Sequence, residues 1–100
     1  MGINLIDTAP VYGFGLSEEL IGKALRGVRH SAVIATKAGR PVYADRPDYS
    51  GTELRRSLEG SLRRLGTDYV DLFQLHDPSP GALRDGDTLA TLDRLRAEGK

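Results

Sequence analysis

Four polar residues of this sequence have the types that a proton relay needs: Asp7, Tyr12, Lys37 and His76. A phenol is a weak acid at neutral pH, but a neighbouring cation stabilises the phenolate, so a tyrosine can then give its proton to a developing alkoxide. Lys37 would be that cation, and Asp7 would hold the lysine in place and keep it charged. His76 would donate to a substrate carbonyl oxygen or tune the tyrosine. Together these roles describe reduction of a carbonyl group, with hydride arriving from elsewhere.

Three of these residues stand at the ends of short apolar runs that have the length and chemistry of β-strands. Asp7 ends the first run, Lys37 ends the second, and His76 follows the third. From these runs we predict strands near residues 3–7, 32–37 and 69–75. Tyr12 lies on the loop that leaves the first strand.

The segments between the predicted strands have the three- and four-residue apolar spacing of amphipathic helices. We predict helices near residues 17–28, 51–65 and 87–98. Ser17 is the expected N-cap of the first helix, and Ser50 with Glu53 has the spacing of a capping box for the second. Gly66 is expected to end the second helix. The apolar stripe of that helix is Leu54, Leu58, Leu62 and Leu65.

The alternation of strand and helix three times in succession predicts the α/β class, with parallel strands joined by right-handed crossovers. In such folds ligands bind at the carboxyl ends of the strands, where Asp7, Lys37 and His76 would share one edge. A longer loop over residues 39–49 follows the second strand. Three aromatic residues are candidate walls of a substrate pocket near this edge: Phe14, Tyr43 and Tyr49.

Several signals also have a structural interpretation. An aspartate after a strand is commonly a turn former, a lysine there is commonly solvated, and a histidine before Asp-Pro commonly bonds its own loop. Gly13 and Gly15 lack the third glycine of a dinucleotide fingerprint, because Glu18 stands in its place. No metal site is expected from two histidines and no cysteine. The arginines of the second helix are interpreted as a solvated face: Arg55, Arg56, Arg63 and Arg64.

Composition limits the classes of partner. The chain has 100 residues, with 14 Lys and Arg against 14 Asp and Glu, so its formal net charge is zero. Nucleic acid is not an expected partner, because phosphate binding needs clustered cations. No apolar run approaches the roughly 20 residues of a membrane span, and no cysteine is present for disulfides. We therefore expect a cytoplasmic protein that binds neither nucleic acid nor membrane.

The motifs around these residues resemble the signature region of the aldo-keto reductase superfamily. The resemblance rests on Asp7-Thr-Ala-Pro-Val-Tyr12-Gly13, Ile21-Gly-Lys-Ala-Leu25, Ala35-Thr-Lys37 and Asp71-Leu-Phe-Gln-Leu-His76. It runs through the whole chain. It implies a (β/α)₈ barrel of oxidoreductases that use NADP or NAD.

The resemblance also implies a role for each of the four residues. Tyr12 would be the general acid and Lys37 the cation that activates it, while Asp7 would anchor Lys37 close to the nicotinamide and His76 would orient the substrate. The implied substrate is a small carbonyl compound or a sugar hemiacetal, interconverted with the alcohol or the lactone. The segments at residues 13–18 and 76–78 resemble the aldose 1-dehydrogenase and pyridoxal 4-dehydrogenase branch.

Two other functions remain open at this point. One is a non-catalytic interaction subunit similar to the same family. The other is a Schiff-base aldolase on a barrel, with Lys37 as its nucleophile. The aldolase would have no need of the pair formed by Asp7 and Tyr12.

A (β/α)₈ barrel takes roughly 250 residues, so this chain corresponds to three of its eight units. We therefore expect one partial domain over residues 1–100, truncated at both ends, with the main cofactor-binding segments outside it. Three parallel strands would leave two sheet edges unpaired if the chain were expressed alone. Such a fragment is expected to be inactive by itself.

Overall fold

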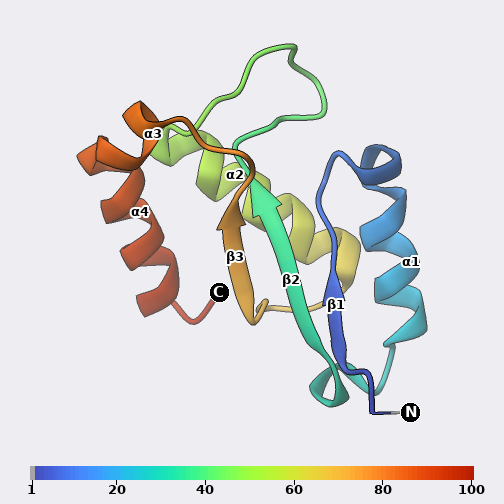
Figure 1. Ribbon diagram of the computed structural model, residues 1–100. Helices are drawn as coiled ribbons and strands as arrows, with labels where there is room; N and C mark the ends of the chain where they lie inside the picture. The colour runs from blue at the N-terminus through green and yellow to red at the C-terminus, as the bar shows by residue number, and fades with distance from the viewer. Residues whose placement is uncertain (1) are drawn as a thin grey trace.

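Three parallel strands form one sheet in the order β1-β2-β3 (Figure 1). The structure, a computed structural model, describes residues 2–100. The strands are β1 (Leu5–Asp7), β2 (Val33–Ala38) and β3 (Leu72–Leu75), and β2 pairs with both neighbours. The three predicted strands and their parallel pairing are confirmed, although β1 and β3 are shorter than expected.

Helices connect the strands and also follow the last one. In chain order the helical elements are η1 (Tyr12–Gly15), α1 (Leu16–Ala24), η2 (Arg29–Ser31), α2 (Gly51–Leu65), α3 (Pro80–Arg84) and α4 (Gly86–Ala97). In Figure 1, α2 crosses behind the sheet, with α1 on the β1 side and α4 on the β3 side. Leu5 and Leu72 lie at exposed positions of the strands. Within residues 2–100, no helix has the length and apolarity needed to cross a membrane.

The apolar core lies between the sheet and α2. The predicted leucine stripe of α2 is buried along its whole length, because its spacing places every member on the face that meets the strands. Ile34 of β2 packs against this face, and Leu95 brings α4 into the same core. The core cluster consists of Ile34, Leu58, Leu62, Leu65, Val70 and Leu95.

Both ends of α2 form as the capping signals predict. The Ser50 hydroxyl accepts a hydrogen bond from the Glu53 backbone N–H at 3.3 Å, and Gly66 closes the helix with a φ of 66°. The capping box is not reciprocal, however. The Glu53 carboxylate accepts from the Tyr43 hydroxyl, and the Ser50 N–H donates to Asp48. The loop before α2 is therefore tied to the first turn of that helix.

The first helix differs from its prediction at both ends. Its N-cap is Gly15, with a φ of 93°, rather than Ser17, and it ends at Ala24, a turn earlier than expected. A Cβ at Gly15 would lie 2.9 Å from Arg64 Cδ, so a glycine is needed at this entry to the helix. Ser17 instead lies in the first turn, where its hydroxyl hydrogen-bonds to that of Thr8 at 2.7 Å.

The third strand begins later than predicted, and its expected first residues contact Arg29. The Arg29 guanidinium donates to the Tyr69 carbonyl oxygen at 3.1 Å and lies over the Tyr69 ring, 4.0 Å from its centroid. It also pairs with the Asp71 carboxylate at 2.9 Å, which in turn accepts from the Ile34 N–H. These side-chain contacts and the backbone hydrogen bond from the Asp71 N–H to the Ile34 carbonyl, at 3.0 Å, join the segments at this end, and β3 starts at Leu72.

The last part of the chain contains a helix that was not predicted. The Ser-Pro dipeptide at residues 79–80 has the N-cap and first-turn chemistry that starts α3. Helix α4 begins at an N-cap formed by Asp85. Its buried face carries Thr88 and Thr91, while Leu89 is exposed. These small side chains allow α4 to approach the first turn of α2.

Glu18 joins α1 to the rest of the fold through a fully buried carboxylate. One of its oxygens accepts from Thr36 Oγ1 and the other from Arg64 Nε, both at 2.6 Å. The expectation of a solvated arginine face on α2 is therefore wrong at Arg64, whose guanidinium neutralises a buried charge. Arg55 likewise pairs with Glu98 beyond α4, at 2.6 Å.

We predict that Arg64→Leu lowers the free energy of unfolding by about 3 kcal/mol, because it leaves the buried Glu18 carboxylate without its counter-charge. Urea unfolding of the protein, expressed from the longest reading frame that contains this chain, measures the change. Arg63→Leu is the matched control, since Arg63 is exposed on the same helix, and its effect should stay within about 0.5 kcal/mol. Equal unfolding midpoints for the two variants would contradict this role of the Glu18–Arg64 pair.

Candidate active site

The carboxyl ends of the strands bring the predicted polar residues to one edge of the sheet. Asp7 is the last residue of β1, Lys37 lies next to the end of β2, and His76 directly follows β3. Tyr12 begins η1, on the connection that leaves β1. In Figure 1 this is the upper edge, toward which the strand arrows point. Parallel pairing aligns these ends although the residues are far apart in the sequence.

Lys37 is the centre of the contacts at this edge. Its Nζ atom lies 3.0 Å and 2.9 Å from the two carboxylate oxygens of Asp7 and 2.8 Å from the carbonyl oxygen of Thr8. The Tyr12 hydroxyl oxygen is 3.4 Å away. An ammonium group has three protons and no lone pair, so Lys37 is the donor in every one of these contacts. The Tyr12 proton therefore stays available to a third group.

The charge of Lys37 is stable in this environment. Burial by itself would lower the pKa of Lys37, but hydrogen bonds to Asp7 and Tyr12, with the negative charge of Asp7, outweigh that effect and raise it above its ordinary value. Lys37 is therefore positively charged throughout the neutral pH range. The Lys37 ammonium is thus a permanent cation 3.4 Å from the Tyr12 hydroxyl oxygen.

His76 stands next to Tyr12. The two ring centroids are 6.1 Å apart, and the ring planes meet at 80°. Burial lowers the pKa of His76, and the cations Lys37 and Arg40 lower it further, while nearby carboxylates oppose this only in part. The imidazole is therefore neutral at pH 7, with one N–H that can donate to a substrate oxygen.

A turn of left-handed residues follows Tyr12. Gly13, Phe14 and Gly15 have φ values of 61°, 54° and 93°. A positive φ is uncommon for phenylalanine. This conformation leaves the Phe14 side chain 85% exposed, on the connection that also carries Tyr12.

The two tyrosines of the loop after β2 use their hydroxyl groups within the protein. Tyr43 donates to the Glu53 carboxylate on α2. Tyr49 donates to the backbone carbonyl oxygens of His76 and Asp77, at 2.7 Å and 2.9 Å. Of these two tyrosines, Tyr49 is the one that contacts the loop carrying His76.

Sequence reasoning missed two groups that belong to this edge. The Thr8 carbonyl accepts from Lys37, and a backbone carbonyl leaves no signal in a sequence. Arg40 pairs with Asp77 at 2.9 Å and adds positive charge near His76. Its position just beyond the second strand was a usable signal, because that is the same edge of the sheet.

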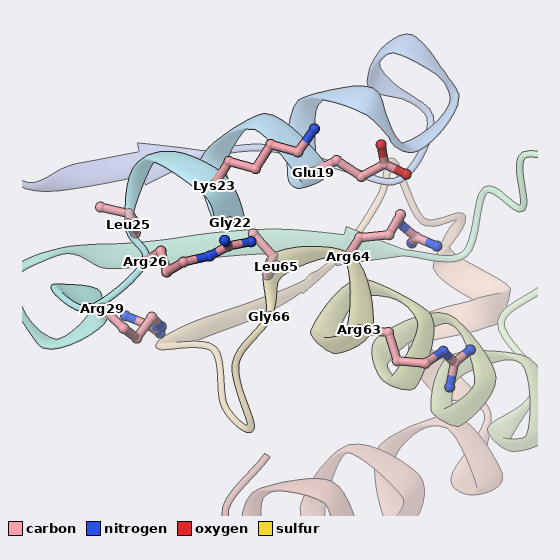
Figure 2. Close-up of a pocket in the computed structure, with 11 residues that line it drawn as sticks. Glu19, Gly22, Lys23, Leu25, Arg26, Arg29, Arg63, Arg64, Leu65 and Gly66 are labelled. Carbon is pink, nitrogen blue, oxygen red and sulfur yellow. The ribbon is translucent and has the colours of Figure 1, made fainter.

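A cluster of basic residues lies elsewhere, between α1 and α2 (Figure 2). Here Lys23, Arg26 and Arg63 surround a hollow of about 460 Å³, with Glu19 at its border. The hollow is formed by the later turns of both helices, at the opposite end of α1 from Tyr12. Basic residues near helix C-termini complement the helix dipole, and the exposed carbonyl groups there disfavour an anion. The cluster is therefore explained without a ligand.

A parallel α/β fold that gathers a tyrosine, a lysine, an aspartate and a histidine at its strand ends has the architecture of an enzyme domain. The whole chain, residues 1–100, matches the family model described as the aldo/keto reductase family. The chain belongs to the aldo/keto reductase family.

Individual relatives agree with this assignment. The chain is 41% identical to L-galactose dehydrogenase of Arabidopsis thaliana, covering 100% of this chain and 32% of that protein. It is 40% identical to the NADH-specific methylglyoxal reductase of Escherichia coli (strain K12), covering 99% and 35%. The structure of an aldo/keto reductase from Klebsiella pneumoniae in complex with NADP and acetate matches with a TM-score of 0.82 and 35% identity, covering 99% and 32%. The chain thus spans about a third of the length of these proteins.

We predict that His76 titrates below the ordinary imidazole pKa of 6.5, because burial and the nearby cations lower its pKa. Side-chain NMR measures the titration midpoint of His76. Arg40→Gln should raise the His76 midpoint, whereas Arg96→Gln, at an exposed position of α4, should leave it unchanged.

The same shift sets a pH dependence of stability. The folded state disfavours the protonated imidazole, so the stability due to neutral His76 is lost as the pH falls from 6.5 toward its lowered pKa. A His76 midpoint at or above 6.5 would contradict this description of the site.

Proposed function

We propose that this chain is the proton-relay part of an oxidoreductase that interconverts a carbonyl compound and its alcohol, or a sugar hemiacetal and its lactone, with a nicotinamide cofactor. The observation that carries the proposal is the Lys37 ammonium, which is bound to the Asp7 carboxylate at 2.9 Å and lies 3.4 Å from the Tyr12 oxygen. Membership of the aldo/keto reductase family supports the same chemistry.

Tyr12 acts as the general acid in the direction of reduction. Its proton moves to the substrate oxygen as that oxygen gains negative charge, and the Lys37 ammonium stabilises the phenolate that forms. Neutral His76 donates a hydrogen bond to the same oxygen and orients the substrate. In the direction of oxidation the phenolate accepts the proton of the substrate hydroxyl, so the same residues serve both directions.

The groups at this edge fit a nicotinamide cofactor. Ammonium, phenol and imidazole move protons, and none of them supplies hydride. A bound nicotinamide supplies or accepts that hydride. Asp7, with a side chain that is 58% exposed at the edge, would contact it. NADP and NAD are both compatible with the proposal, since one solved relative holds NADP and another relative is named as NADH-specific.

Small carbonyl compounds and sugars are the proposed substrates. The name of one relative, L-galactose dehydrogenase, supports a sugar, and that of the other, methylglyoxal reductase, supports a small carbonyl compound. The aldose 1-dehydrogenase and pyridoxal 4-dehydrogenase branch would add a pyridoxal-type substrate to the sugar hemiacetals. Phe14, Tyr43 and Tyr49 would line the pocket. Phe14 is the most accessible of them, and the other two would offer their rings, because their hydroxyls are already bonded. A cytoplasmic location is part of the proposal, because a cysteine-free sequence suits a reducing compartment.

The geometry gives no support to a Schiff-base aldolase. A nucleophilic lysine must lose its proton before it attacks a carbonyl group. The Lys37 Nζ atom lies within 3.0 Å of three acceptor oxygens of Asp7 and Thr8, and hydrogen bonds to Asp7 and Tyr12 raise its pKa against the effect of burial. A non-catalytic subunit of the family would instead bind a partner without turnover, so a measured turnover separates it from the enzyme.

We predict that Tyr12→Phe lowers NAD(P)-linked carbonyl reduction by about 100-fold or more, because the variant lacks the proton donor. Steady-state turnover of the protein from the longest reading frame that contains the chain measures the loss. Tyr69→Phe is the matched control: it also removes one phenolic hydroxyl, but before β3, away from the site. Turnover of Tyr12→Phe equal to that of the control would overturn the assignment.

The 100-residue chain expressed by itself is predicted to bind little or no NADPH. Of the groups that would contact the cofactor, the chain contains only those at the strand ends. In the three-stranded sheet, β1 and β3 each also have one unpaired side. NADPH fluorescence measured against increasing protein concentration tests this, with the product of the longest reading frame as the positive comparison. A saturable change with the isolated chain would show that the prediction is wrong.

A further inference from the structure

Tyr49 connects two loops at the edge of the sheet. Its hydroxyl lies 2.7 Å from the carbonyl oxygen of His76 and 2.9 Å from that of Asp77. A phenolic hydroxyl has one proton, so the two carbonyl groups share a single donor. The loop after β2 thereby holds the backbone of the loop after β3 at the residue whose imidazole stands beside Tyr12.

The backbone at Asp77 has the conformation that this contact requires. Successive carbonyl groups point in opposite directions along an extended chain, so two of them reach one hydroxyl only if the residue between them is not extended. Asp77 has a φ of 51°. Positive φ is uncommon for residues other than glycine, and Pro78 further disfavours a helical conformation at the preceding residue. Such a conformation persists only where surrounding contacts hold it, and Tyr49 binds the carbonyl groups on both sides.

Tyr49 is itself held firmly in place. Its ring packs against Gly39, where a Cβ would lie 2.0 Å from the ring, so only a glycine admits it. The Gly39 carbonyl accepts from the Asp48 N–H at 3.0 Å, which closes the loop. From the other side, Thr88 of α4 donates its hydroxyl proton to the Tyr49 carbonyl at 2.8 Å. Contacts from Gly39, just after β2, and from α4 thus fix the position of the Tyr49 hydroxyl that bonds the His76 loop.

We propose that Tyr49 is a positioning residue for His76: its hydroxyl holds the carbonyl groups of His76 and Asp77 and so fixes the imidazole beside Tyr12. Tyr49 acts through His76, and its hydroxyl is not free for a substrate. The effect on turnover rests on the proposed function. The position of the His76 imidazole is a separate matter, because it can be measured without any reaction.

Tyr49→Phe tests the proposal, because it keeps the ring against Gly39 and removes only the hydroxyl. In the protein from the longest reading frame, the His76 midpoint measured by NMR should rise toward 6.5, since a released imidazole loses burial and moves away from the nearby cations. The turnover number should fall about 10- to 100-fold, with KM for the cofactor unchanged, because a misplaced group lowers the rate of the chemical step. Tyr43→Phe removes a hydroxyl from the same loop and should leave the His76 midpoint unchanged.

Amide hydrogen exchange separates a local effect from a loss of fold. The His76 N–H donates to the Ala38 carbonyl at 2.7 Å, so its exchange reports on the anchored loop. Faster exchange confined to the loop after β3 in Tyr49→Phe would support the positioning role. Uniform acceleration of all slow amides, including that of the buried Ile34, would overturn it, because Tyr49 would then be a general structural residue.

The outcomes for Tyr12→Phe and Tyr49→Phe distinguish the two proposals. If Tyr12→Phe keeps full turnover, the proposed function fails, while a shifted His76 midpoint in Tyr49→Phe still supports the hold on the imidazole. If Tyr12→Phe is inactive but Tyr49→Phe has an unchanged His76 midpoint and turnover number, the positioning role is overturned and the proposed function stands.

Discussion

One ammonium group sets the arrangement of the candidate site. The Lys37 side chain is only 15% exposed, so its three protons must find acceptors in the protein. It finds them in the Asp7 carboxylate and the Thr8 carbonyl, and the Tyr12 oxygen lies within reach of the same atom. A poorly hydrated charge without a counter-charge would be costly. The ionisation of Lys37 and the placement of its neighbours from β1 therefore depend on one another.

Strand β2 carries this arrangement into the rest of the fold. Successive side chains of a strand point to opposite faces, so Thr36, which precedes Lys37, is directed toward the helices. Its hydroxyl donates to the buried Glu18 carboxylate of α1, which is neutralised by Arg64 of α2. The central strand thus contacts the site through Lys37 and the two helices through Thr36. A displacement of β2 would disturb both sets of contacts at once.

The helices and strands that could be predicted were those whose apolar spacing and capping residues all indicate the same structure. Helix α2 has a periodic leucine stripe, a serine N-cap and a terminal glycine, and each of these local signals agrees with the others. Helix α1 was predicted less well because its buried face includes the charged Glu18. That burial depends on Arg64, 46 residues away, which apolar spacing within the helix does not reveal.

Alternating strands and helices imply parallel strands, and parallel strands align their carboxyl ends, so the shared edge of Asp7, Lys37 and His76 follows from the sequence alone. The hydrogen-bond partners of these residues follow only from the folded chain. A backbone carbonyl completes the Lys37 contacts, and Tyr49, a candidate pocket wall by its type, bonds the His76 loop through its hydroxyl. The physical reason is that periodicity records the environment within one element. Hydrogen bonds between loops depend on where distant segments lie in space, which no local pattern encodes.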